Sequence, residues 1–177
     1  MKTYTEYIQS KKNSLETIEF LVLNHLNELK FEFYIHEHPP LKTVEESKIL
    51  RGEIEGGHTK NLFLRDKKKN NFLITTNENQ KIDLKELEKK LSTGRLSFGS
   101  RDRLYEFLGV KPGSVSPLSL INDQNKKVMF YIDKNLYKEK ILNFHPLVNH
   151  LTISLKLNDF ILFLNSINRT FNELEFE

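Results

Sequence analysis

The chain of 177 residues contains no cysteine and no tryptophan. Without cysteine there is no disulfide framework, no thiol nucleophile, and no zinc or iron–sulfur site held by thiolates. No stretch approaches the roughly 18 apolar residues of a membrane span, and the first residues lack the apolar segment of a signal peptide. We therefore expect a cytoplasmic protein without a membrane partner.

The charge is also nearly balanced, with 27 Lys and Arg against 24 Asp and Glu and a net charge of +3. Proteins that grip phosphate backbones usually carry a stronger basic surface, so charge alone does not indicate a nucleic-acid partner. The lysine runs 11–12, 67–69 and 126–127 fit solvated turns, with contacts to RNA as the alternative. Thirteen phenylalanines and a hydrophobic share of 38% supply one core.

Apolar periodicity predicts an α+β fold that leans towards α/β. Helical spacing covers residues 15–29, 83–91, 100–108 and 160–167, and a capping box at 43–46 opens a short helix that ends near Gly52. Strand patterns cover residues 31–36, 59–64, 72–76, 128–132 and 151–155. Because short turns join most strands, we expect a mixed, largely antiparallel sheet surrounded by helices. Residues 1–177 are predicted to form a single domain, with residues 1–13 as a candidate N-terminal appendage.

Lys60 is the first candidate site residue. In a strand it shares a face with Leu62 and Leu64, which points its ammonium towards an apolar interior or a cleft. A lysine in such surroundings is costly unless it is paired or poised for a charged group. The alternative is an exposed lysine at the frayed start of the strand.

Gly113-Ser114-Val115-Ser116-Pro117 is the second candidate. Glycine and proline four residues apart restrict a loop, so that successive backbone N–H groups can face one point and stabilise an oxyanion. The segment equally fits a tight connection after a helix that ends at Gly109.

His145-Pro146, with Asn149 and Thr152, is the third. A histidine here can orient a hydroxyl or shuttle a proton near neutral pH, or it can simply bond beside a turn.

Two further observations limit the chemistry. His36 and His38 share a strand face and could bind a metal if His58 or a carboxylate lay near, but no further ligand is evident in the sequence. The sequence motifs of serine hydrolases, zinc proteases, P-loop enzymes and dinucleotide-binding proteins are all missing. We expect neither a metal nor a cofactor.

Taken together, these motifs resemble the YbaK/ProX family of aminoacyl-tRNA deacylases, the free-standing relatives of the editing insertion in bacterial prolyl-tRNA synthetases. The similarity runs from about Phe33 to Phe163 and rests on the strings 57–64, 113–117 and 144–149. The most specific match is Leu108 to Val115, which suits the ProX branch.

The resemblance implies the YbaK fold and hydrolysis of mischarged proline tRNA, with alanyl-tRNA(Pro) as the substrate. Cysteinyl- or seryl-tRNA deacylation, or an inactive module that binds tRNA or protein, are the alternatives. It also implies the roles of the site residues. Lys60, Gly113 and Ser114 would be catalytic, and substrate binding would involve Asn61, Val115, Ser116, Pro117, His145 and Asn149. The implied partner is the acceptor end of an aminoacylated tRNA, with prolyl-tRNA synthetase or an elongation factor as further candidates.

Overall fold

The computed structural model describes residues 1–11, 17–40 and 52–176. Its helices are α1 (Tyr4–Ser10), α2 (Glu19–Glu28), α4 (Leu84–Lys90), α5 (Arg101–Leu108) and α6 (Leu157–Ser166), with 3-10 helices η1 (Pro117–Ile121) and η2 (Lys134–Lys138). Its strands are β1 (Phe33–Glu37), β2 (Gly57–Arg65), β3 (Asn71–Asn77), β4 (Ser97–Phe98), β5 (Val128–Asp133), β6 (Ile141–Phe144), β7 (Leu151–Lys156) and β8 (Asn172–Leu174). The short helix predicted after Thr43 lies outside the described residues.

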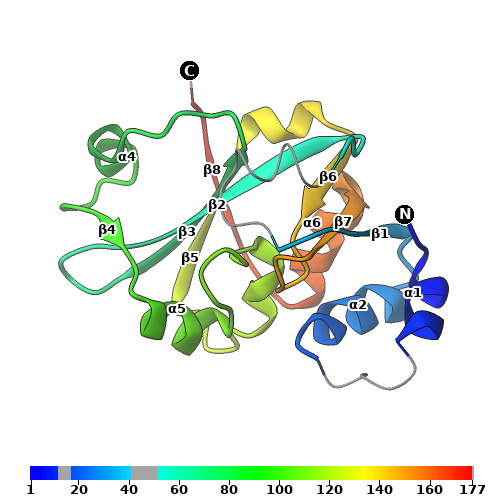
Figure 1. Cartoon of the computed structure of the whole chain (residues 1–177). Helices are drawn as coiled ribbons and strands as arrows, with labels where there is room; N and C mark the ends of the chain where they lie inside the picture. The colour runs from blue at the N-terminus through cyan, green and yellow to red at the C-terminus, as the bar shows by residue number, and fades with distance from the viewer. Residues whose placement is uncertain (12–16, 41–51, 177) are drawn as a thin grey trace.

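The strands form an eight-stranded sheet in the order β1-β7-β6-β2-β3-β5-β8, and β4 pairs with β2 off this path. β2 and β3 form the predicted antiparallel hairpin, whereas β6 runs parallel to β2 and β5 runs parallel to β3. In Figure 1, α4 and β4 lie at one end of this hairpin, and β6, β7, α1 and α2 lie at the other. The mixed sheet with surrounding helices confirms the predicted α+β class.

Two apolar clusters pack on opposite faces of β2. Phe63 belongs to the larger cluster, which includes residues of α2, α5, α6 and η1. Leu62 and Leu64 belong to the smaller cluster, which includes Leu87 of α4. This alternation along the strand follows the two-residue period of β structure.

Local signals set several boundaries. The Ser100 hydroxyl accepts a hydrogen bond from the backbone N–H of Arg103 at 3.2 Å, and Gly109 ends α5 with a φ of 66°. Both features match the sequence prediction, because a serine satisfies free N–H groups at a helix start and glycine adopts the left-handed conformation at its end. The sequence analysis missed α1, β4, β6 and β8, which are too short to show a clear apolar period.

The N-terminal residues contribute to the core. Tyr7 of α1 is fully buried in the larger cluster, and Lys2 exchanges two backbone hydrogen bonds of 2.8 Å with Ile35 of β1. The segment predicted as a candidate appendage therefore packs on the sheet over residues 2–10. The single-domain organisation stays a prediction. No helix among the described residues is long and apolar enough to cross a membrane.

Replacement of Gly99 by alanine is expected to destabilise the fold. An added Cβ would overlap the ring of Phe63, a core residue that is only 5% exposed. Overpacking of this kind costs about 1–3 kcal/mol, which urea unfolding monitored by circular dichroism would measure. Gly94→Ala is the matched control, because its Cβ meets no atom within 4 Å. Equal stability of the two variants would contradict the packing argument.

Candidate functional site

Strand β2 sends its two candidate residues to opposite faces. Lys60 shares the face of β2 that carries Leu62 and Leu64, on the side of the smaller apolar cluster, as predicted. Asn61 lies on the side of Phe63, and its side-chain oxygen accepts a hydrogen bond of 2.6 Å from the hydroxyl of Thr75 on β3. Lys60 and Asn61 therefore cannot act as a side-by-side pair in one pocket, although they are neighbours in sequence.

The Lys60 side chain is half-buried, and its ammonium donates a hydrogen bond to the backbone carbonyl of Gln80, in the segment that follows β3. Partial burial makes a lysine ammonium effective as a point charge, because fewer water molecules screen it. Strand β2 therefore presents a partly desolvated cation at its β6-paired end.

The pairing of β2 with β6 ends just before Lys60 and His145. These parallel strands pair at Gly57↔Leu142 and His58↔Asn143, and the ladder stops there. Lys60 lies two residues beyond His58 on β2, and His145 follows Phe144, the last residue of β6. Both candidates therefore come just after the end of this ladder, where β2 and β6 separate.

The His145 ring is oriented by the first residue of β7. Its Nδ1 lies 2.8 Å from the carbonyl oxygen of Leu151, and the His38 ring lies 6.2 Å away between centroids. A carbonyl can only accept, so Nδ1 donates, and in a neutral ring Nε2 is then an acceptor. An acceptor of this kind can receive a hydrogen bond from a substrate hydroxyl. Asn149, in the same connection between β6 and β7, is half-buried.

The loop that begins at Gly113 has the conformation its glycine predicts, with φ of 89°. The Ser114 N–H donates a hydrogen bond to the Lys111 carbonyl at 3.0 Å. Because this N–H is already used, an oxyanion at the loop would have to be stabilised by a different backbone N–H. Val115 packs against the larger apolar cluster.

The second half of this loop is built into η1. Pro117 occupies the first turn of η1, and the fully buried Ser116 accepts a hydrogen bond from the Leu118 N–H at 3.3 Å. The Ser116 carbonyl accepts another from the Ser119 hydroxyl at 2.5 Å. These contacts give Ser116 a structural role, and its direct contact with substrate stays a prediction.

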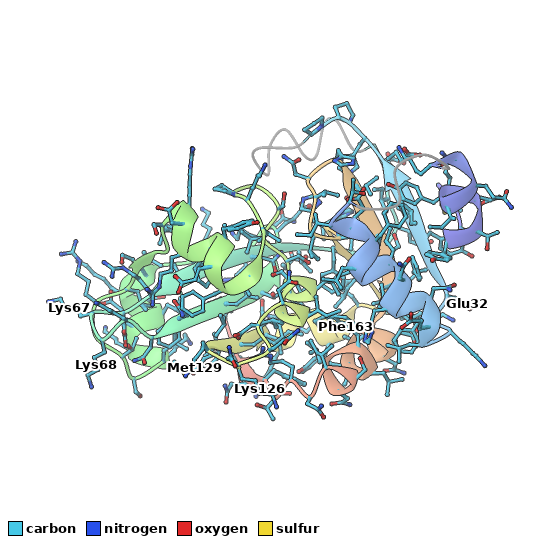
Figure 2. All side chains as sticks on the ribbon, turned by 90° about the horizontal axis from the view of Figure 1, so that it is seen from below. Glu32, Lys67, Lys68, Lys126, Met129 and Phe163 are labelled. Carbon is cyan, nitrogen blue, oxygen red and sulfur yellow. The ribbon has the colours of Figure 1, made fainter. Side chains whose placement is uncertain are left out.

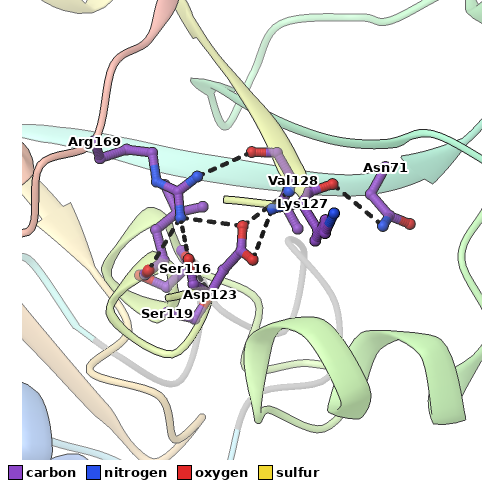
Figure 3. Close-up of polar contacts among 8 residues, drawn as sticks. Asn71, Ser116, Ser119, Asp123, Lys127, Val128 and Arg169 are labelled. Atoms are coloured by element: carbon purple, nitrogen blue, oxygen red, sulfur yellow. Dashed lines mark hydrogen bonds and ion pairs between the residues drawn. The ribbon is translucent and has the colours of Figure 1, made fainter. Parts of the chain in front are cut away.

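A buried ion pair holds η1 in place (Figure 3). Arg169 and Asp123 are 3.1 Å apart, and their side chains are 4% and 3% exposed. Arg169 also donates to the carbonyls of Asp123 at 2.7 Å, Leu120 at 3.4 Å and Val128 at 3.3 Å. The sequence analysis missed this pair, since 46 residues separate its partners and no motif marks either one.

A second polar network crosses β1, β7, β6 and β2. The Ser154 hydroxyl donates a hydrogen bond to the Asn143 side-chain oxygen at 2.6 Å. Because the hydroxyl proton is used in that bond, the Ser154 oxygen accepts a hydrogen bond from His36 Nε2 at 3.0 Å. The Asn143 amide donates to the Glu55 carbonyl, and its own backbone carbonyl accepts from the Thr59 hydroxyl at 2.9 Å. The network therefore fixes the point where β2 leaves β6, one residue before Lys60.

The remaining histidines have separate partners. His38 Nε2 lies 2.8 Å from the Thr152 hydroxyl, whereas His58 Nε2 lies 3.0 Å from the Ile54 carbonyl. Within the described ranges, no three His, Cys, Asp or Glu residues are arranged to hold a metal ion. The histidine trio considered in the sequence does not form a metal site there.

Among the predicted site residues, Lys60 and His145 both follow directly after the end of the β2–β6 ladder. Asn61 faces the other side of β2, and Val115 of the 113–117 loop packs with the cluster on that other side. Within the described part of the chain, no strand pair connects this loop with Lys60 or His145.

Comparisons with known proteins agree on one family. The family model described as the aminoacyl-tRNA editing domain matches residues 38–163. The chain is 37% identical over 155 residues to the prolyl-tRNA editing protein ProX of Acetoanaerobium sticklandii, covering 87% of this chain and 94% of that protein. It is 36% identical over 147 residues to prolyl-tRNA synthetase associated domain-containing protein 1 of Mus musculus, covering 80% and 86%.

Solved structures support the fold. The protein APE2540, described as hypothetical, superposes with a TM-score of 0.66 at 13% identity over 86% of this chain and 96% of its own. A protein provisionally assigned as a trans-editing enzyme for prolyl-tRNA synthetase gives 0.60 at 17% identity over 100% and 99%. At such low identity the likeness concerns architecture alone.

Removal of the buried carboxylate is expected to destabilise the protein strongly. Asp123→Ala leaves Arg169 buried without its counter-charge, which costs about 3–5 kcal/mol in comparable buried pairs. Thermal unfolding would measure this loss. Glu32→Ala is the matched control, because the Glu32–Lys156 pair of 2.8 Å lies on the surface with side chains 79% and 58% exposed, and its loss should leave the melting temperature almost unchanged. Similar losses in both variants would contradict a special role of the buried pair.

The His36 ring is expected to make stability pH-dependent. Burial lowers its pKa below 6.5, and the positive charges of the N-terminus, His38 and His58 lower it further. The unfolded chain then binds the proton more readily, so stability falls as pH drops through 6.5 towards the lower folded pKa. NMR titration of the ring and urea unfolding at several pH values would test this. In His36→Gln, the pH dependence between 7 and 5 should flatten; an unchanged slope would exclude His36 as its source.

Proposed function

Because this chain belongs to the aminoacyl-tRNA editing domain family, we propose that it is a trans-editing deacylase that hydrolyses the ester of mischarged proline tRNA, with alanine as the preferred acyl group. The observation that supports the proposal for its site is that the β2–β6 ladder ends at His58 and Asn143, two residues before Lys60 and His145. A cation and a hydrogen-bonding ring are groups that can bind a ribose ester.

The reaction needs no protein nucleophile. A water oxygen attacks the ester carbonyl, the bond between that carbon and the ribose oxygen breaks, and the ribose oxygen takes a proton. The products are the free amino acid and tRNA with a free terminal hydroxyl. Lys60 stabilises the negative oxygen that develops in the transition state, since a partly desolvated cation favours developing negative charge. His145 Nε2 accepts from the ribose hydroxyl and holds the ester in place.

The selectivity follows from size. A synthetic site for proline cannot strongly exclude the smaller alanine, because each methylene is worth only about 1–3 kcal/mol. A second site that admits alanine but not proline hydrolyses the wrong ester and spares the right one. The family resemblance implies that the loop 113–117 takes part in this size selection, although Val115 packs with the apolar cluster on the face of β2 opposite Lys60.

The partners follow from the substrate. The acceptor end of an aminoacylated tRNA is the ligand that the family implies. We propose prolyl-tRNA synthetase or an elongation factor as further partners, and the cytoplasm as the location where they meet.

Lys60→Ala is expected to lower kcat/KM for alanyl-tRNA(Pro) by about 100- to 1,000-fold, the usual loss when one group that stabilises an oxyanion is removed. The assay follows loss of radiolabelled alanine from proline tRNA, alongside correctly charged prolyl-tRNA. Lys140→Ala is the matched control, since it removes the same charge from an exposed position.

Each outcome discriminates. Hydrolysis of the alanyl ester alone, lost in Lys60→Ala and kept in Lys140→Ala, supports trans-editing at this site. Activity only on cysteinyl or seryl esters would show that the protein is a deacylase of the same family with a different preferred acyl group. Inactivity on all three esters would favour a binding module, and loss of activity with a chelator would favour a metal-dependent hydrolase.

A further inference from the structure

The far end of the β2–β3 hairpin carries cations together with an exposed ring. We call Arg65, Lys67, Lys68 and Phe98 the hairpin-tip surface. All four residues are exposed, and Phe98 keeps 62% of its area in contact with solvent. Figure 2 shows Lys67 and Lys68 projecting outward at the end of the molecule opposite Glu32. The feature to be explained is a large apolar ring left in water in the same cleft as Arg65, on a strand paired to the hairpin whose turn carries Lys67 and Lys68.

This surface is built by rigid contacts. Strand β4 pairs with β2 at Leu64↔Phe98 and Arg65↔Ser97, which sets Phe98 beside the hairpin. Arg103 of α5 donates to the Lys69 carbonyl at 2.5 Å and to the Asn71 side chain at 2.6 Å, and so ties the helix to the turn. Phe98 is therefore held at a fixed position.

The turn between β2 and β3 carries a positive net charge, with Lys67, Lys68 and Lys69 against Asp66. The Asp66 carboxylate, which belongs to the same turn, is 5% exposed and accepts hydrogen bonds from Asn70 at 2.9 and 2.7 Å, so it is turned inward. The cleft that Phe98 shares with Arg65 and Arg103 also contains Asp102 and Glu106 of α5, so its charges balance, and Lys67 and Lys68 do not line it. The outermost part of this surface suits an anionic partner.

The distance to the proposed ester site suits nucleic acid. Lys60 and Arg65 are five residues apart on one strand, or about 17 Å. Between its pairing with β6, which ends at His58, and its pairing with β4, which starts at Leu64, this edge of β2 pairs with no strand among the described residues. A polynucleotide bound at Lys60 can therefore run along that edge and reach the tip within a few nucleotides.

We propose that the hairpin-tip surface binds the acceptor arm of the tRNA, with Lys67 and Lys68 on backbone phosphates and Phe98 stacked on an unpaired base near the 3′ end. The inference rests on the proposed function, because Lys60 fixes where the ester lies. Proteins that bind single-stranded nucleic acid usually combine cations that contact the phosphate backbone with exposed aromatic rings, since every base offers a face for stacking.

The first test compares substrates of different length. Deacylation is measured on alanyl-tRNA(Pro) and on alanyladenosine, which is too short to reach the tip. The double variant Lys67→Gln with Lys68→Gln should raise KM for the tRNA about 5- to 10-fold, and flatten the dependence of log KM on log salt by about 1.5. Rates on alanyladenosine should not change. Lys85→Gln with Lys140→Gln is the control, because it removes the same charge from exposed positions elsewhere.

The second test addresses stacking. Phe98→Ala and Phe98→Leu should both lower kcat/KM for the tRNA, by about 5- to 100-fold for alanine, whereas Phe98→Trp should retain it. If leucine preserves activity, the ring serves an apolar contact and the stacking proposal is overturned. Equal losses on tRNA and alanyladenosine would assign these residues to folding or to the ester site instead.

A binding assay separates this inference from the proposed function. Fluorescence anisotropy with uncharged proline tRNA should show weaker binding for the double lysine variant than for wild-type protein. If the wild-type protein deacylates the tRNA and the variants bind and hydrolyse it equally well, the role of the hairpin-tip surface is overturned and the proposed function is supported. If the protein does not deacylate the tRNA but binds it through Lys67, Lys68 and Phe98, the surface is supported and the proposed function is overturned. If it neither deacylates nor binds the tRNA, both proposals are overturned.

Discussion

The course of strand β2 is the constraint on which the rest of the molecule depends. Over its length it is paired with β3 on one edge, and its other edge meets β6 at the start and β4 at the end. Backbone pairing fixes side chains to alternate faces, so one strand divides two apolar clusters and aims Lys60 away from Asn61. The same strand connects the ester site at one end with the cationic tip at the other.

Buried polar contacts hold the two sides of the proposed site. Asn143 joins β6 to β2 through Thr59, and to β7 through Ser154, just before the strands separate. Arg169 and Asp123 hold η1, and thereby the end of the loop that starts at Gly113. Neither group reaches a substrate directly. A buried polar group that loses its hydrogen-bond partner destabilises the folded state. Such networks therefore favour a single arrangement of the backbone around the site.

The sequence allowed much of the fold to be predicted, for reasons that lie in local chemistry. Ser100 and Gly109 bound α5 because hydroxyl capping and a left-handed glycine act within a few residues. The hairpin follows from two β-rich runs around a polar turn. Strand β6, by contrast, has only four residues, and its parallel partner lies far away in sequence, so nothing local revealed it.

For the site, the residue types and their order could be read from the chain alone: a strand lysine, a glycine–proline loop and a histidine before a proline, and with them the family. Their arrangement in space depends on the sheet. Lys60 and His145 both follow the end of the β2–β6 ladder because these strands pair in parallel, and Asn61 turns away from Lys60 because successive side chains of a strand alternate. The pairing of β4 with β2 likewise places Phe98 opposite Leu64, near the end of the hairpin. Those relations arise from long-range pairing, which local sequence does not encode.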